Sequence, residues 1–414
     1  MSTKKKIYLD YAATTPLDPR VLKAMMPYLK NKFGNASSLH SFGQEAMEGV
    51  DLARAKLADF LRCEPQEIIF TSGATESNNH VLKALPRAYK RQYRVDYDQM
   101  EIITTAIEHP CVLESARFDY TERGIKVHYL PVDKDGLVSL TELKKKISDK
   151  TVLISIMYAN NEIGTIQPIA EIGQLVSEVN ADRAKRKVPP LFFHTDAVQA
   201  VNYLDCDVQK LGVDFLSLSA HKIYGPKGVG ALFVRVGANG SSPVFAPFFH
   251  GGHQEYGKRA GTLNVAGIVG LGVAIELLQT KEHKDEIVRI KKMRDKIITT
   301  ILKKIPNTFL NGSLEKRLPN NVNITFVNAE GESILMKLDM EGIAVSTGSA
   351  CASGSLNPSH VILGIGVKPE HAHGSVRITL GRQTTMAEVD RLLKVLPGVI
   401  KDLRRMSPLE TRNN

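Results

Sequence analysis

The stretch VDFLSLSAHKIYGPKG, residues 213–228, decides how the rest of the chain is interpreted. Its first half is apolar at most positions, which is typical of a strand that is covered on both faces of a sheet. The run then ends on Ser219, His221 and Lys222, before glycine and proline interrupt it. Lys222 either meets solvent at the strand end, as most lysines do, or is held in a site for covalent chemistry. The remaining sequence has to distinguish these two interpretations.

Six other β-rich runs alternate with amphipathic helical stretches along the first 280 residues. They cover residues 67–70, 101–107, 126–132, 151–158, 190–196 and 230–236. Together with residues 213–219 they predict an α/β domain with a mainly parallel, seven-stranded sheet between helices. From about residue 281 the pattern changes to that of a smaller α+β domain. We therefore expect a large domain over 16–280 and a small domain built from 1–15 and 281–414.

The composition is that of an ordinary globular protein. The 414 residues are 43% hydrophobic, and 54 Lys and Arg against 44 Asp and Glu give a net charge of +10. Basic and acidic residues are interspersed, as in 284–298, which indicates solvated helix faces and no nucleic-acid surface. No apolar run is long enough for a membrane span and no apolar segment follows the N-terminal lysines, so we expect a cytoplasmic protein with no membrane contact. The four cysteines form no CxxC pair, so neither a metal site nor a disulfide framework is expected.

Polar side chains follow several of the predicted strands, where ligands of open α/β sheets bind. Gly73, Ala74 and Thr75 lead into a helix start, which is either an ordinary cap or a phosphate site. Asp196 is either a cap or a partner for a protonated ring nitrogen. His109 is either a loop histidine or an aromatic face for a ligand. With Lys222, these groups match the requirements of pyridoxal phosphate.

A series of motifs also occurs in a known order. The chain resembles the class V, fold-type I pyridoxal-phosphate enzymes over roughly residues 7–408, and most closely the cysteine desulfurases of the NifS/IscS group. The motifs that carry this resemblance are LDYAATTP (9–16), NASSLHSFG (35–43), FTSGATESNN (70–79), EHP (108–110), NNEIGTIQPI (160–169), HTDAVQ (194–199), SAHKIYGPKG (219–228), RAGTLN (259–264), GSAC (348–351) and VRITLGR (376–382).

The resemblance implies a role for each motif residue. Lys222 would bind the cofactor covalently and move the substrate α-proton, Asp196 would pair with the pyridinium nitrogen, and Gln199 would contact the ring oxygen. His109 would stack on the ring and transfer protons near the substrate thiol. The phosphate would be held by Ala74, Thr75, Ser219, His221 and, from the other subunit of a homodimer, Thr262. Asn160 and Arg377 would orient the substrate carboxylate, a task that suits a guanidinium.

Cys351 lies in VSTGSACASGS, a run of small residues. A free cysteine is often a small buried hydrophobe, but this run offers almost nothing to pack around it. We expect a mobile loop over about 345–358 that brings the thiol to the cofactor. The resemblance then implies that L-cysteine becomes L-alanine while its sulfur stays on Cys351 as a persulfide. A sulfur-acceptor protein, such as an iron–sulfur scaffold, would receive it, and Cys351 would transiently ligate a cluster.

Alternative functions share parts of this sequence pattern. A selenocysteine lyase or a class V aminotransferase would use the same cofactor site, although a transaminase needs no mobile thiol. A nucleotide-binding protein is suggested by the glycines of GIVGLG (267–272), but they lie inside an apolar helical stretch and follow no strand.

Overall fold

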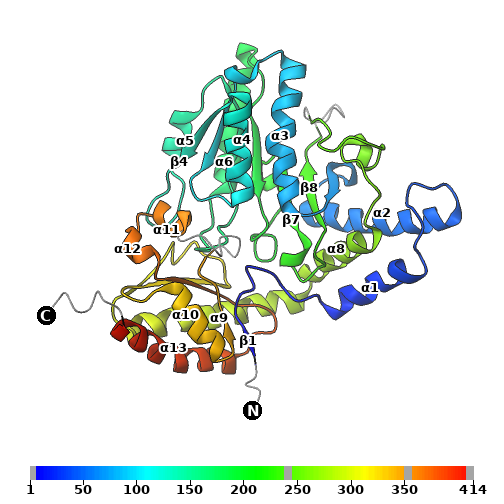
Figure 1. Ribbon diagram of the computed structural model, residues 1–414. Coiled ribbons are helices and arrows are strands. Elements are labelled where there is room, and N and C mark those ends of the chain that lie inside the picture. The colour runs from blue at the N-terminus through cyan, green and yellow to red at the C-terminus, as the bar shows by residue number, and fades with distance from the viewer. Residues whose placement is uncertain (1–5, 237–244, 349–356, 407–414) are drawn as a thin grey trace.

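The computed structural model describes residues 6–236, 245–348 and 357–406 (Figure 1). Its main sheet has the predicted seven strands, in the spatial order β2-β8-β7-β6-β5-β3-β4. Only β8 runs against the other strands. The strands are β2 (Ile68–Thr71), β3 (Glu101–Thr105), β4 (Lys126–Leu130), β5 (Thr151–Ser155), β6 (Phe192–Asp196), β7 (Phe215–Ser219) and β8 (Gly230–Val234). The predicted α/β fold of a fold-type I enzyme is confirmed.

Helices cover both faces of this sheet, which explains the continuous apolar runs. Neighbouring residues such as Leu153 and Ile154 are both fully buried, in different hydrophobic clusters. One cluster packs against α2, α6 and α8, and the other against α3 and α4. The helices of this part are α1 (Pro19–Lys30), α2 (Ser41–Leu61), α3 (Ala74–Tyr93), α4 (Pro110–Arg123), α5 (Leu140–Lys146), α6 (Ile169–Arg186), α7 (Val208–Leu211) and α8 (Val265–Leu278).

A second hydrophobic core lies below the main sheet in Figure 1. It contains β9 (Thr308–Leu310), β10 (Asn321–Phe326) and β12 (Ser375–Thr379), which form an antiparallel sheet, and β1 (Ile7–Tyr8), which pairs with β11 (Ile343–Ala344). Its helices are α9 (Lys281–Lys304), α10 (Gly331–Met340) and α13 (Met386–Met406), while the short α11 (His360–Gly364) and α12 (Pro369–Ala372) lie toward the main sheet. Because this core uses residues 7–9 and 290–403, we propose the domain boundary near residue 281.

Two further features concern the surface. Figure 1 shows α1, the connection after it and the first turns of α2 reaching outward from the main body. In the three described ranges, no helix is both long and apolar enough to cross a membrane.

Candidate active site

A cavity of about 500 Å³ opens beyond the carboxyl ends of the parallel strands. The residues after β2, β3, β5, β6 and β7 contribute to its wall, together with the N-terminal segment and β12. The predicted residues that line it are Ala74, Thr75, His109, Asp196, Gln199, Ser219, His221, Lys222 and Arg377. The structure thus brings nine of the twelve predicted site residues to one cavity.

One end of the cavity is built to hold an anion. Helix α3 begins at Ala74 after Gly73, whose φ of 149° favours glycine. The first N–H groups of a helix have no partner within it and point at such a ligand. A Cβ on Gly230 would lie only 2.7 Å from the Cα of Gly73, so glycine lets β8 pass directly beside the start of α3, which we call the phosphate cup. Burial, assisted by Lys222, lowers the pKa of His221 to about 4, so its neutral ring can donate one N–H to a phosphate.

Asp196 lies at the end of β6 with 6% of its surface exposed. One carboxylate oxygen accepts a hydrogen bond of 2.6 Å from Nδ2 of Asn78, and the other accepts one of 3.0 Å from the N–H of Val198. Asn78 is itself fully buried in α3, and its Oδ1 has no partner. Asn78 therefore orients the predicted partner of the ring nitrogen, a role that sequence reasoning missed.

Lys222 ends a short 3-10 turn, Ala220–Lys222, that follows β7. Its Nζ donates hydrogen bonds to the carbonyl oxygens of Ala12 and Ala13, the latter at 2.8 Å. Nε2 of Gln199 also donates to the Ala12 carbonyl, at 3.0 Å. The half-buried amine therefore lines the cavity, and its assignment as the cofactor-binding lysine stays a prediction.

His109 caps the N-terminus of α4 with its Nδ1, which accepts a hydrogen bond of 3.2 Å from the N–H of Cys111. Since a backbone N–H can only donate, Nδ1 carries the lone pair and the ring proton sits on Nε2. Burial lowers the pKa of His109, and the charge of Lys222 lowers it further against the opposing effect of Asp196. At neutral pH the ring is therefore uncharged and acts as a hydrogen-bond donor through Nε2.

Arg377 reaches the cavity from β12 in the small domain and is 2% exposed. Its guanidinium donates to Oδ1 of Asp10 at 2.9 Å and to the carbonyl oxygen of Asn161 at 3.0 Å. Its Nε is buried and has no partner. The group retains hydrogen-bonding capacity for a ligand carboxylate.

Asn160 does not lie at the cavity, in contrast to the predicted contact with substrate. It is fully buried, its Nδ2 donates to the carbonyl of Ile107, and its Oδ1 accepts from the N–H groups of Glu162 and Ile163. The adjacent Asn161 lines the cavity instead. The side chain of Asn160 therefore holds the loop in its conformation through hydrogen bonds, while Asn161 lines the cavity.

Two predicted residues remain. Thr262 is exposed and is absent from the lining of this cavity, so any phosphate contact has to be made to another subunit. Cys351 and most of its predicted loop lie outside the described residues.

The chain is similar to known proteins over nearly its whole length. The family model for class V aminotransferases matches residues 7–392. A cysteine desulfurase IscS of Dictyoglomus turgidum is 49% identical over 405 residues, covering 98% of this chain and 97% of the relative. A mitosomal cysteine desulfurase of Trachipleistophora hominis is 46% identical over 412 residues, covering 98% and 89%.

Solved structures agree. A NifS-like protein superposes with a TM-score of 0.84 at 37% identity, covering 96% of this chain and 100% of that one. SspA in complex with cysteine gives a TM-score of 0.75 at 37% identity, covering 90% and 98%. The chain therefore belongs to the class V aminotransferase family, the pyridoxal-phosphate enzymes of fold type I. Within that family it is a cysteine desulfurase.

The cavity residues fit pyridoxal phosphate chemically. An amine can bond to the aldehyde, a buried carboxylate can pair with the ring nitrogen, and a helix N-terminus can hold the phosphate. Asn78, outside the cavity lining, supports the carboxylate.

Proposed function

We propose that this enzyme removes the sulfur of L-cysteine, with Lys222, Asp196 and His109 acting on the cofactor and substrate and Cys351 receiving the sulfur. The observation that carries the proposal is the convergence of an amine, a buried carboxylate and a helix N-terminus on one cavity. When bound, pyridoxal phosphate withdraws the electron pair of the broken Cα–H bond into its ring.

The chain's own residues then have defined tasks. Nζ of Lys222 would hold the cofactor covalently and would carry the substrate α-proton. Asp196 would keep the ring nitrogen charged, and the N–H groups of Ala74 and Thr75, with Ser219 and His221, would hold the phosphate. Gln199, which lines the cavity, would contact the ring oxygen. His109 donates through Nε2 toward the substrate thiol.

The substrate carboxylate binds Arg377, assisted by Asn161, which lines the cavity where the side chain of Asn160 does not. The Cys351 thiolate then attacks the substrate sulfur, the carbon–sulfur bond breaks, and its electron pair stays with the carbon fragment that leaves as L-alanine. The persulfide on Cys351 is passed to a sulfur-acceptor protein, for which an iron–sulfur scaffold is our candidate. Transient cluster ligation by Cys351 and a cytoplasmic location stay predictions.

A homodimer is part of this proposal. Large apolar side chains are exposed along the outward-reaching α1–α2 region, notably Leu39 at 92% and Phe33 at 70%. An exposed apolar surface of this kind is typical of a protein interface. Thr262 belongs to a loop that is tied to the same region by the buried ion pair of Arg54 and Glu255. A partner seated there would receive Thr262 at its phosphate cup.

Two measurements test the proposal. Borohydride reduction followed by peptide mapping should place the cofactor on Lys222, and a label on another lysine would refute its role. After brief exposure to L-cysteine without reductant, mass spectrometry should find one added sulfur on the Cys351 peptide and not on the peptides of Cys63, Cys111 or Cys206. The Cys351→Ser variant should still bind the cofactor but release almost no sulfide. Sulfide release by that variant would contradict the mechanism.

A further inference from the structure

The motif DYAATT, residues 10–15, has no role in the function proposed above, yet it crosses the cavity between the two domains. We call it the N-terminal segment. It is fixed to β12 of the small domain through Thr379, whose N–H donates to the Leu9 carbonyl at 2.8 Å. The Thr379 hydroxyl also accepts a hydrogen bond of 2.9 Å from the N–H of Ala12. Thr379 lies two residues from Arg377 on the same strand. These hydrogen bonds therefore fix the position of the segment relative to Arg377, the proposed substrate-binding arginine.

The same segment contacts the cofactor-binding side of the cavity. Carbonyl oxygens of Ala12 and Ala13 accept from Nζ of Lys222, and the Thr14 hydroxyl lies 3.1 Å from Nδ1 of His221. On the other side, Asp10 holds Arg377. Six consecutive residues thus provide acceptors for two cations, one from each domain.

Thr15 fixes the backbone that carries Lys222. Its N–H and its hydroxyl both donate to the carbonyl of His221, at 2.9 and 3.0 Å, and its Oγ1 accepts from the N–H of Tyr224 at 2.8 Å. Thr15, which is 4% exposed, therefore forms hydrogen bonds with the backbone on both sides of Lys222 and Ile223.

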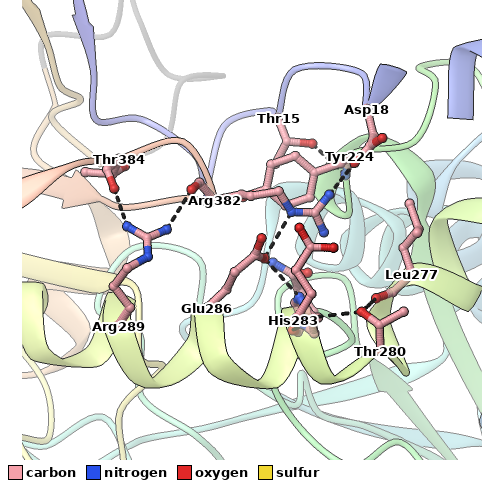
Figure 2. A network of polar contacts seen from close by, with 12 residues as sticks. Thr15, Asp18, Tyr224, Leu277, Thr280, His283, Glu286, Arg289, Arg382 and Thr384 are labelled. Atoms are coloured by element: carbon pink, nitrogen blue, oxygen red, sulfur yellow. Dashed lines mark hydrogen bonds and ion pairs between the residues drawn. The ribbon is translucent and has the colours of Figure 1, made fainter. Parts of the chain in front are cut away.

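Tyr224 has a backbone conformation that needs such support. Its φ of 64° is unfavourable for a bulky residue and persists only where the surroundings impose it. Figure 2 shows how Arg382 supplies this support from the small domain. The Arg382 N–H donates to the Tyr224 hydroxyl at 2.6 Å, and its guanidinium lies 4.3 Å from the centre of the ring. The guanidinium also pairs with Asp18 and Glu286.

We propose that the N-terminal segment is a positioning element that couples Lys222 of the large domain to Arg377 of the small domain, with Thr15 and Thr379 as positioning residues. The inference rests on the proposed function, because it assigns these two groups to cofactor and substrate. Neither threonine touches the reaction. Thr15 restricts the position of Lys222, and Thr379 restricts the position of the segment beside Arg377. Misplacing a reacting group by about 1 Å costs on the order of 100-fold in rate.

The test uses full-length Thr15→Val and Thr379→Val, which keep the side-chain shape and lose the hydroxyl. Thr325→Val is the control, because Thr325 is equally buried in the adjacent strand β10 and, among the residues that the structure describes, its hydroxyl bonds to Asn311 alone. Cofactor-free protein is mixed with pyridoxal phosphate, and the absorbance of the lysine-bound cofactor is followed in time. The KM for L-cysteine is measured separately.

We expect both variants to capture the cofactor about 10-fold to 100-fold more slowly and to raise KM at least about threefold. Thr15→Ser should restore both values, and Thr325→Val should match the wild type within about twofold. Wild-type capture at Lys222 with unchanged kinetics in both valine variants would overturn the coupling while leaving the proposed function intact. Variants that alter only capture, or only KM, would also overturn it. Failure of the wild type to capture cofactor at Lys222 would refute the proposed function itself.

Discussion

The substitution Asp196→Asn separates a catalytic carboxylate from a structural cap. The new side chain has nearly the same volume, and its oxygen can still accept the N–H of Val198. Its NH₂ group would face the NH₂ of Asn78, but Oδ1 of Asn78 has no partner. Rotating the Asn78 amide therefore restores a hydrogen bond between the two residues.

The magnitudes follow from this geometry. Two charge-assisted hydrogen bonds become neutral ones, so the free energy of unfolding of the cofactor-free protein should fall by only about 1 kcal/mol. The cofactor loses more, because its ring nitrogen no longer faces a charge in a buried site. We expect cofactor affinity to fall about 10-fold, and turnover at saturating cofactor to fall roughly 100-fold or more.

The assay combines alanine formation, equilibrium cofactor titration and urea unfolding of the cofactor-free protein. Asp214→Asn is a matched control. Asp214 precedes β7, so it lies at the opposite end of the strands from the cavity. Its carboxylate accepts a hydrogen bond of 2.8 Å from the N–H of Phe193, and it is not among the cavity-lining residues. The control should retain wild-type turnover. If Asp196→Asn also keeps wild-type turnover and loses only stability, Asp196 is no more than a cap for Val198.

Three other outcomes are expected. Arg54→Ala breaks a buried ion pair with Glu255 and should lower the free energy of unfolding by about 3–5 kcal/mol. Lys56→Ala on the same helix breaks an exposed pair with Glu276 and should lower it by under about 1 kcal/mol, so equal losses in urea unfolding would contradict a dependence on burial. Burial raises the pKa of Glu108 to about 8, so its contribution to stability is complete below about pH 4.5 and is lost progressively as the pH rises from there through 8; Glu108→Gln removes this loss, so its melting temperature relative to the wild type should rise over the same pH range, and a pH-independent difference would speak against it. Leu39→Asp should convert the proposed homodimer to a monomer in sedimentation, while Met340→Asp, exposed at 79% on α10, should leave the oligomeric state of the wild type unchanged; a Leu39 variant with the same oligomeric state as the wild type would contradict the proposed interface.

The sequence predicted the fold and most of the polar residues that line the cavity, because both depend on residue type. Seven apolar runs became one sheet since strands buried on both faces carry apolar side chains at successive positions. Asp196, His221 and Lys222 were found because charged or polar residues at the ends of buried strands are unusual. Their meeting in one cavity follows from the common direction of the parallel strands.

The missing parts depend on conformation. Ala12 and Ala13 act through carbonyl oxygens, which every residue has, so their sequence carries no signal. Asn160 and Asn161 are chemically identical neighbours in a turn, and only the backbone decides which one faces the cavity. Asn78 lies one helical turn after the start of α3, on the buried side of this helix. A polar residue at a buried helix position could have indicated a hydrogen bond to a polar side chain at the end of a strand, such as Asp196.

The charges at the cavity explain its ligand better than the net charge of the chain does. Lys222, Lys227 and Arg377 line it, against the carboxylates of Asp196 and Glu76. Burial would raise the pKa of Glu76, but its bonds to Arg259 and Ser72 outweigh burial and keep it ionised, already paired with a cation. Asp196 is therefore the lining carboxylate that remains for a cationic ring nitrogen, and the cations remain for a phosphate and a carboxylate. A phosphorylated pyridine beside an amino acid brings a group of opposite charge to each of these side chains, whereas a neutral ligand would bring none.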